Sequence, residues 1–314
     1  MNEISICGFK RNVILSLLDL NEEELIMPKK HYAKTALFFT AMFWGSTFAI
    51  GKIATEAFSP AFIIALRFTV ASIVLILVSL PLMKLVNKEY IRDGFWMGVT
   101  LFASYMLQVA GLALDTSPGK SAFLCTTYSV LVPFLYWGIT KKRPKLLHIF
   151  CVFICMIGIG ILSLQGDMSM TAGDILTLLS GVPCAVNLVI SAIVTQDKDP
   201  LLLTMIELAF TAVFAWVAVG VTNTFPAEFP MNTVGGIVYL GVIATALCLY
   251  LQSYGMKYAD ASIGGMLLSL ESVFGVIFSI ILYKEHVTLR MLVGFIVIFT
   301  AIILSQWEGK KKEA

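Results

Sequence analysis

Residues 111–162 read GLALDTSPGKSAFLCTTYSVLVPFLYWGITKKRPKLLHIFCVFICMIGIGIL, and residues 255–304 read GMKYADASIGGMLLSLESVFGVIFSIILYKEHVTLRMLVGFIVIFTAIIL. When Gly111 is laid over Gly255, both stretches consist of an apolar run, a charged elbow and a second apolar run. Each run has about 20 residues, the length that an α-helix needs to cross roughly 30 Å of hydrocarbon. The repeated stretch therefore predicts two pairs of membrane-spanning helices.

The same apolar pattern continues through most of the chain and gives ten candidate spans. The 314 residues are 58% hydrophobic and 13% charged, which is too apolar for a soluble domain. Short connections carrying charge, Pro or Gly separate the spans. The sequence predicts an all-α membrane protein of ten transmembrane helices, near residues 34–54, 60–83, 94–114, 119–140, 146–164, 173–194, 201–221, 233–254, 261–283 and 288–307.

The repeat predicts two halves of opposite orientation. A second overlay places Ser59 to Arg67 over Asp199 to Glu207. Because five spans per half is an odd number, the second half must enter the membrane upside down relative to the first, with the substrate site between the halves near the midplane. We expect a first module at 34–165 and a second at 172–307, with an N-terminal cytoplasmic extension at 1–33 and a cytoplasmic tail at 308–314.

Lys and Arg residues predict the orientation of the chain, because short cytoplasmic loops carry an excess of them. Only Lys120, Lys284 and Arg290 fall in the loops on the other side. Both termini are therefore expected in the cytoplasm, and the protein in the plasma membrane. The apolar stretch from Asn12 to Leu20 is too short to span, so either it forms a surface helix or Met27 is the natural start. The positive residues on the cytoplasmic side are Lys29, Lys30, Lys34, Lys84, Lys88, Arg92, Lys141, Lys142, Arg143, Lys145, Lys198, Lys257 and Lys310 to Lys312.

Several motifs in both halves carry a resemblance to a known family. They include WGSTFAIGKIA at 44–54, ALRF at 65–68, YSVLVP at 128–133, GDILTLLSGVPCA at 173–185 and YKEHVTLRMLVGFIVI at 283–298. In these motifs the chain resembles the EamA-type carriers of the drug/metabolite transporter superfamily. The resemblance implies two inverted five-helix EamA modules, a central cavity formed by helices one to four and six to nine, and transport of amino acids, metabolites, cations or drugs.

Two positions depart from the family pattern. Cys184 stands where the sixth span usually carries a Trp, and Ser272 follows Leu270 and Glu271 where the ninth span usually reads Leu-Glu-Pro. Because Pro interrupts the hydrogen bonds of a helix, its loss predicts a straighter ninth helix in this chain.

Ionisable side chains inside spans are costly, so each is a candidate functional residue. Glu271 is near the bilayer centre and is either a proton-coupling carboxylate or the fixed partner of Arg67. Arg67 either binds a substrate carboxylate or orders the bundle. Glu207 and Arg67 lie at different depths, which argues against a direct pair between them. Lys52 either contacts substrate or extends to the surface and meets Glu56.

Four further candidates are polar or aromatic. The family resemblance supports Trp44 and Tyr128 as cavity residues. Gln108 and Asn187 are polar at mid-span, where each either binds substrate or forms hydrogen bonds between helices. The six Cys and three His lack the spacing of a metal site, so we expect neither a metal nor a cofactor.

These features predict a secondary-active transporter of a small solute, an amino acid, metabolite or drug, that works by alternating access. A coupling proton and a homodimer are compatible with the sequence. The alternative substrate, a nucleotide sugar or phosphate ester in exchange, would require several converging basic groups, and only Lys52 and Arg67 lie within spans. A non-transporting membrane scaffold is a further alternative. No nucleophile and base pair favours an enzyme, and a net charge of +2 does not favour a nucleic-acid partner.

Overall fold

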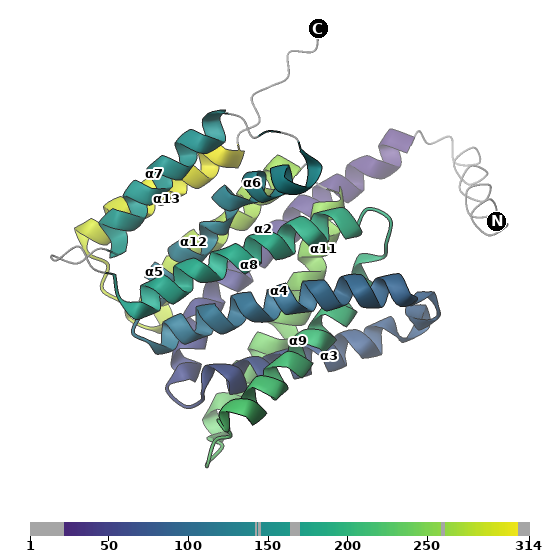
Figure 1. The fold of residues 1–314 in the computed structure, drawn as a ribbon, viewed down its shortest axis with the longest axis horizontal. Coiled ribbons are helices and arrows are strands. Elements are labelled where there is room, and N and C mark those ends of the chain that lie inside the picture. The colour runs from purple at the N-terminus through teal and green to yellow at the C-terminus, as the bar shows by residue number, and fades with distance from the viewer. Residues whose placement is uncertain (1–21, 142, 144–145, 164–169, 259–260, 307–314) are drawn as a thin grey trace, which may run out of the picture.

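The structure is a computed structural model that describes residues 22–141, 143, 146–163, 170–258 and 261–306. This part of the chain is helical and contains no strand (Figure 1). The predicted all-α class is therefore confirmed. The helices are α2 (Glu22–Thr55), α3 (Pro60–Ser79), η1 (Leu80–Leu85), α4 (Lys88–Ala113), α5 (Pro118–Thr126), α6 (Tyr128–Thr140), α7 (Leu146–Ser163), α8 (Ala172–Val194), α9 (Pro200–Thr222), η2 (Met231–Thr233), α10 (Val234–Val238), η3 (Tyr239–Leu247), α11 (Cys248–Tyr258), α12 (Ala261–Leu282) and α13 (Leu289–Gln306).

Seven helices of the described part are long and apolar enough to cross a membrane. Three apolar helices, at Leu146–Leu162, Leu267–Leu282 and Leu289–Leu304, are shorter, so the count of ten spans stays a prediction. Large apolar side chains such as Leu77, Phe153 and Val217 are exposed on the outside of the bundle, as a lipid environment requires. The segment from Asn12 to Leu20 and the tail at 308–314 lie outside the described residues, and α2 already begins at Glu22.

Equivalent helix starts in the two halves use the same local chemistry. Ser59 accepts a hydrogen bond from the N–H of Phe62 at the start of α3, and Asp199 accepts from Leu201 and Leu202 at the start of α9. Pro occupies the first helical position in both cases, where its missing N–H costs nothing. The aligned Ser-Pro and Asp-Pro pairs thus mark the starts of corresponding helices.

Two predicted spans are interrupted, which corrects the expectation of continuous helices. The span expected at 119–140 breaks at Thr127 into α5 and α6, and the hydroxyl of Thr127 donates to the carbonyl of Leu124. Pro133 lies inside α6 and has no N–H with which to continue the helical pattern. The span expected at 233–254 contains the π-helix η3, in which the Thr245 hydroxyl donates to the carbonyl of Leu240.

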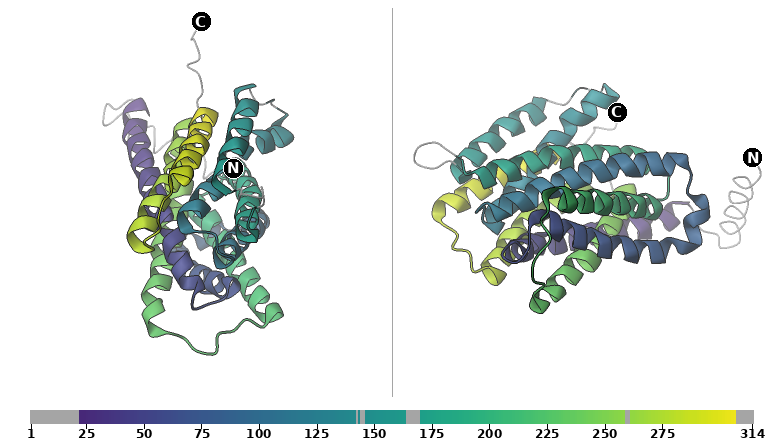
Figure 2. Two further views of the ribbon diagram at one scale, coloured as in Figure 1. Left: turned by 90° about the vertical axis from the view of Figure 1, so that its left-hand side faces the viewer. Right: turned by 60° about the horizontal axis from the view of Figure 1, so that its bottom comes forward.

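The helices form two groups whose contacts correspond in pairs (Figures 1 and 2). The first group is α2, α3, η3, α11 and α12, and the second is α8, α9, α4, α5 and α6. In the first, α2 packs on α12 and α11; in the second, α8 packs on α5, α6 and α4. In the first group α3 contacts η3, and in the second group α9 makes the corresponding contact with α4. The groups meet along α3 and α9, and α7 packs on α13 at the opposite edge of the bundle.

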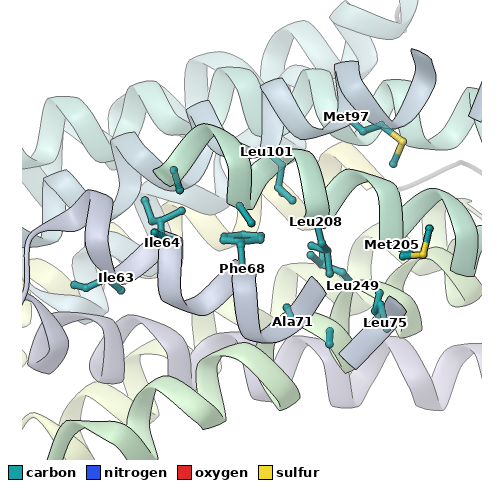
Figure 3. Close-up of a cluster of buried hydrophobic side chains, with 14 of the residues drawn as sticks. Ile63, Ile64, Phe68, Ala71, Leu75, Met97, Leu101, Met205, Leu208 and Leu249 are labelled. Carbon is teal, nitrogen blue, oxygen red and sulfur yellow. The ribbon is translucent and has the colours of Figure 1, made fainter. Parts of the chain in front are cut away.

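Close helix contacts and an apolar core hold these groups together. A Cβ atom on Gly98 of α4 would lie 2.7 Å from Phe210 of α9, and one on Gly241 of η3 would lie 2.7 Å from Val70 of α3. Small residues therefore permit the same close approach in each group. Phe68 of α3 is fully buried in the core between α3, α4, α9 and α11 (Figure 3).

Candidate functional site

A small cavity lies between the two groups of helices, in the middle of the bundle. Its volume is about 50 Å³, which is room for a few water molecules, whereas pockets for drug-sized ligands are about 300–1,000 Å³. The cavity in this structure is thus too small for a drug-sized solute. Polar and aromatic side chains from both groups line the cavity together with a few apolar ones: Trp44, Thr47, Phe48, Leu101, Ser104, Tyr105, Gln108, Cys125, Tyr128, Cys184, Asn187, Leu188, Leu249, Gln252 and Glu271.

Glu271 of α12 is the one charged side chain among the described residues that line the cavity. It is 4% exposed, and its Oε1 accepts a hydrogen bond of 3.1 Å from the Thr126 hydroxyl. The Tyr128 side chain lies within hydrogen-bonding reach of the same carboxylate. In the described part of the chain no Lys or Arg is at ion-pair distance from Glu271. A buried carboxylate without a protein cation favours a proton or a bound cation as its partner.

Arg67 of α3 lies behind the cavity wall and not against Glu271. Its Nε donates to the Thr245 hydroxyl over 2.5 Å, and its guanidinium carbon is 4.6 Å from the ring centroid of Tyr105. Its Nη2 lies 3.4 Å from both the Tyr105 hydroxyl and the Ala244 carbonyl oxygen. The alternative that Arg67 is the fixed partner of Glu271 is therefore wrong. These contacts favour the other reading, in which Arg67 orders the bundle by joining α3 to η3.

Trp44 of α2 contributes its ring to the cavity and its N–H to the same π-helix. The indole N–H donates to the carbonyl of Ala244 over 3.0 Å. That carbonyl is also the acceptor near Arg67, so a partly buried side chain from α2 and a buried one from α3 converge on one backbone group of η3. π-helical turns release carbonyls from the regular pattern and are frequent at functional sites. The interruption in this span thus positions two of the predicted site residues.

Asn187 of α8 joins the cavity to Glu207 of α9. Its Nδ2 donates to Glu207 Oε1 over 2.7 Å and lies 3.0 Å from the carbonyl oxygen of Met97 and 3.2 Å from the Thr100 hydroxyl. Asn187 lines the cavity, whereas Glu207, 2% exposed, lies behind it. Glu207 and Arg67 have no ion pair with each other, as their depths predicted. Each of these buried charges instead bonds to neutral groups: Glu207 to Asn187 of α8, and Arg67 to Thr245 of η3 and Tyr105 of α4.

Of the last two predicted residues, Gln108 lies at the cavity and Lys52 at the end of the bundle. Gln108 lines the cavity, and its Nε2 is 3.2 Å from Cys125 Sγ. Lys52 does not line it: its Nζ donates to the Leu112 carbonyl over 2.6 Å and lies 4.0 Å from Asp115 Oδ1. Its ion pair is with Asp115 and not with Glu56, the partner considered from the sequence. Lys52 thus joins the end of α2 to the end of α4.

Sequence reasoning missed several polar residues of the site, namely Thr47, Ser104, Thr126, Cys125 and Cys184. A signal was available for one face: Leu101, Ser104, Tyr105 and Gln108 follow the three- and four-residue spacing of one side of a helix. From the sequence, the cysteines were considered only as metal ligands, and Cys184 also as a departure from the family pattern. Groups of three or more metal-ligating side chains do not occur in the described residues.

A multi-span helical bundle around a small central polar cavity is an architecture that membrane transporters use. The profile of the EamA-like transporter family matches residues 33–164 and 171–307. The chain belongs to this family, which confirms the resemblance found in the sequence.

Relatives and a solved structure agree with this class. An uncharacterized transporter of Archaeoglobus fulgidus is 28% identical over 276 residues, covering 88% of this chain and 86% of the relative. The uncharacterized transporter YvbV of Bacillus subtilis is 24% identical over 296 residues, covering 92% and 95%. One crystal structure of a protein that is 18% identical has the same fold, with a TM-score of 0.60 over 87% of this chain and 96% of that one. The protein is therefore a multi-pass membrane transporter of a small molecule.

Proposed function

We propose that the protein is a secondary-active transporter that carries a small solute across the plasma membrane by alternating access. In this proposal two inverted five-helix modules, at 34–165 and 172–307, supply ten spans with both termini in the cytoplasm. The paired helix contacts support the repeat. Each group contains helices from both modules, and corresponding helices of the two modules occupy corresponding places in opposite groups. The seams between the groups are then the places where the bundle opens.

The observation that carries the proposal is the charge of the cavity wall. Glu271 is the one charged lining side chain in the described residues, and it has no protein cation. The aromatic rings of Trp44, Phe48, Tyr105 and Tyr128 line the same space and offer faces that attract cations. This combination favours a solute that carries an amine or another cationic group, such as an amino acid or a cationic drug, with a proton as the competing partner of Glu271.

The same wall disfavours a nucleotide sugar or phosphate ester. Phosphate recognition uses Lys and Arg side chains that converge on the anion. Of the described residues that line the cavity, none is Lys or Arg, and Arg67 bonds to Thr245 behind Tyr105. An ionised Glu271 would also repel a phosphate. We therefore infer that the carboxylate selects against such anions.

Solute flux into proteoliposomes tests the function. Amino acids, amines and drug cations are screened with and without a pH gradient, for the wild type, Glu271→Gln and the matched control Glu207→Gln. Both carboxylates are buried, but only Glu271 lines the cavity. We expect Glu271→Gln to lower flux at least tenfold and Glu207→Gln to retain most of it. Flux that Glu271→Gln leaves unchanged would contradict a role of this carboxylate, and no flux of any solute would favour the scaffold.

A further inference from the structure

The short helix α5 belongs to the second group of helices, and it packs both on α8 of its own group and on α12 of the first group (Figure 1). Its contact with α8 is a buried ionic one. Lys120 Nζ is 2.9 Å from Asp174 Oδ2, and the Thr116 hydroxyl donates to Asp174 Oδ1 over 3.1 Å. Asp174 is fully buried, so separating its carboxylate from Lys120 and Thr116 would leave a buried charge without partners. We infer that α5 stays with α8.

The contact of α5 with α12 crosses from one group to the other, and we call it the α5–α12 seam. At one end, the backbone N–H of Gly119 donates over 2.9 Å to Oε2 of Glu285, which lies just after the end of α12. In the middle, a Cβ atom on Gly275 would lie 2.3 Å from the Cβ of Ala122, so the helices touch. At the other end, Thr126 reaches Glu271. Two polar contacts therefore flank a tight apolar one.

The seam closes the cavity on the Gly119 side. Cys125 and Tyr128 line the cavity on either side of the break at Thr127, where α5 ends. Beyond the break, α6 packs on α8, α7 and α13. The described contacts of α12 with this interrupted span are thus concentrated on α5. Separation of α5 from α12 would open the cavity toward the end that carries Gly119 and Glu285, which the charge pattern predicts to face outside.

The hydroxyl of Thr126 has two acceptors. Its Oγ1 is 3.1 Å from Glu271 Oε1 and 2.7 Å from the carbonyl oxygen of Ala122, one turn earlier in α5. A single hydroxyl proton serves both, and hydrogen bonds to an ionised acceptor are roughly twice as strong as those to a neutral one. An ionised Glu271 therefore holds the hydroxyl across the seam, and a neutralised Glu271 leaves it to its own helix.

We propose that the α5–α12 seam is a gate and that Thr126 is the positioning residue that links the ligand state of Glu271 to its opening. The proposal rests on the proposed function, in which Glu271 takes a proton or a cationic solute. When Glu271 is occupied, the seam loses its inner polar contact, and the equilibrium shifts toward separation. Couplings between sites typically change equilibria about 5- to 150-fold. We expect a shift of at least about fivefold.

A cysteine at position 122 reports on the seam without any substrate. Ala122 of α5 is fully buried against Gly275 of α12, so a cysteine in its place is shielded while the seam is closed. The protein is placed in nanodiscs, where both ends are accessible, and treated with a charged maleimide. Mass spectrometry follows the modification of position 122. Asp115→Cys is the control for reagent activity, because the Asp115 side chain is 99% exposed.

The expected pattern has four parts. In the Ala122→Cys background, Glu271→Gln and Thr126→Val each accelerate labelling at least about fivefold, because Thr126→Val removes the bond across the seam and Glu271→Gln replaces its ionised acceptor with a weaker neutral one. The double variant is no faster than the faster single variant, because both act through the same bond. Thr126→Ser keeps the hydroxyl and labels as slowly as the parent. Glu285→Ala removes the contact at the other end of the seam and also accelerates labelling. Its acceleration multiplies with that of Glu271→Gln, because the two contacts are separate.

Several results would overturn the proposal. The link through Thr126 would be excluded if Thr126→Val labelled as slowly as the parent, or if Thr126→Ser labelled as fast as Thr126→Val. It would also be excluded if the effects of Thr126→Val and Glu271→Gln multiplied in the double variant. Thr126→Ala repeats the test if Thr126→Val does not fold. Flux in proteoliposomes separates the two proposals. Flux that depends on Glu271, together with labelling rates that do not change, would rule out the gate but not the transport proposal. The expected labelling pattern without flux of any solute would rule out the transport proposal but not the gate.

Discussion

Asn187 on α8 and Glu207 on α9 are joined by a hydrogen bond of 2.7 Å that runs outward from the central cavity. Both side chains are buried, and the amide also contacts the backbone of α4 at Met97. One neutral side chain therefore links three helices of the second group and supplies a donor to a buried carboxylate. The wall of the cavity and the packing behind it thus depend on the same residue.

Replacement of Asn187 by Leu should destabilise the protein. Glu207 would lose its side-chain donor while it stays buried, which costs about 1–3 kcal/mol. We expect a lower melting temperature for Asn187→Leu in detergent and a partial recovery when Glu207→Gln is added, because a neutral amide is less costly to bury. Equal melting temperatures of wild type and Asn187→Leu would show that the bond contributes nothing.

The class and the course of the chain could be predicted, but two local features could not. Apolar runs of about 20 residues indicate helices in a membrane whatever their order. The break at Thr127 and the π-helix at Tyr239–Leu247 lie inside such runs. Both are changes in the pattern of backbone hydrogen bonds, and hydropathy carries no information on that pattern. Pro133 gave a local hint for the first, and the second had none.

The site shows a similar limit. Depth along a span predicted that Glu271 is central and that Arg67 and Glu207 do not pair, because 1.5 Å of rise per residue fixes height. Which way a side chain faces depends on rotation about the helix axis and on the neighbours of that helix. The structure therefore places Glu271 and Asn187 at the cavity but Arg67 and Glu207 behind it. The rotation of each helix about its axis could not be predicted from this single sequence and its repeat.

Arg67→Lys should reduce stability more than solute affinity. Lys lacks the planar guanidinium that stacks on Tyr105 and cannot reproduce the donors that reach Thr245 and Ala244. We expect a loss on the order of 1–3 kcal/mol, seen as a lower melting temperature. Because Arg67 does not line the cavity, the KM for a transported solute should change less than threefold. A large rise in KM with unchanged melting would instead assign Arg67 to the substrate.

Gly98→Ala should be destabilising, whereas Gly220→Ala should not. A Cβ at Gly98 would lie 2.7 Å from Phe210 Cβ and 3.0 Å from the Glu207 carbonyl oxygen, so α4 and α9 would have to move apart. Overpacking of this kind costs about 1–3 kcal/mol. Gly220 has no atom within 4 Å of the added Cβ, and Ala is the better helix former there. Thermal unfolding of the two variants in one detergent compares them directly, and equal effects would argue against the close contact.

The predicted orientation can be checked with two exposed loop residues. Asp115 follows α4, and Lys141 follows α6, at opposite ends of the predicted fourth span. An impermeant maleimide should label Asp115→Cys in intact cells and Lys141→Cys only after the membrane is permeabilised. Labelling in the reverse pattern would place both termini outside, and labelling of both from one side would exclude a span between them.

Cys184 should make transport sensitive to a small thiol reagent. It lines the cavity and is partly accessible, whereas Cys125 is 4% exposed and contacts Gln108. An added methylthio group on Cys184 would occupy cavity space that a bound solute needs. Methyl methanethiosulfonate should therefore inhibit flux of the wild type, bound solute should slow the inhibition, and Cys184→Ala should resist it. Cys125→Ala is the matched control and should stay sensitive. Inhibition that persists in Cys184→Ala but disappears in Cys125→Ala would show that solute and reagent meet on the α5 side of the cavity, not on the α8 side.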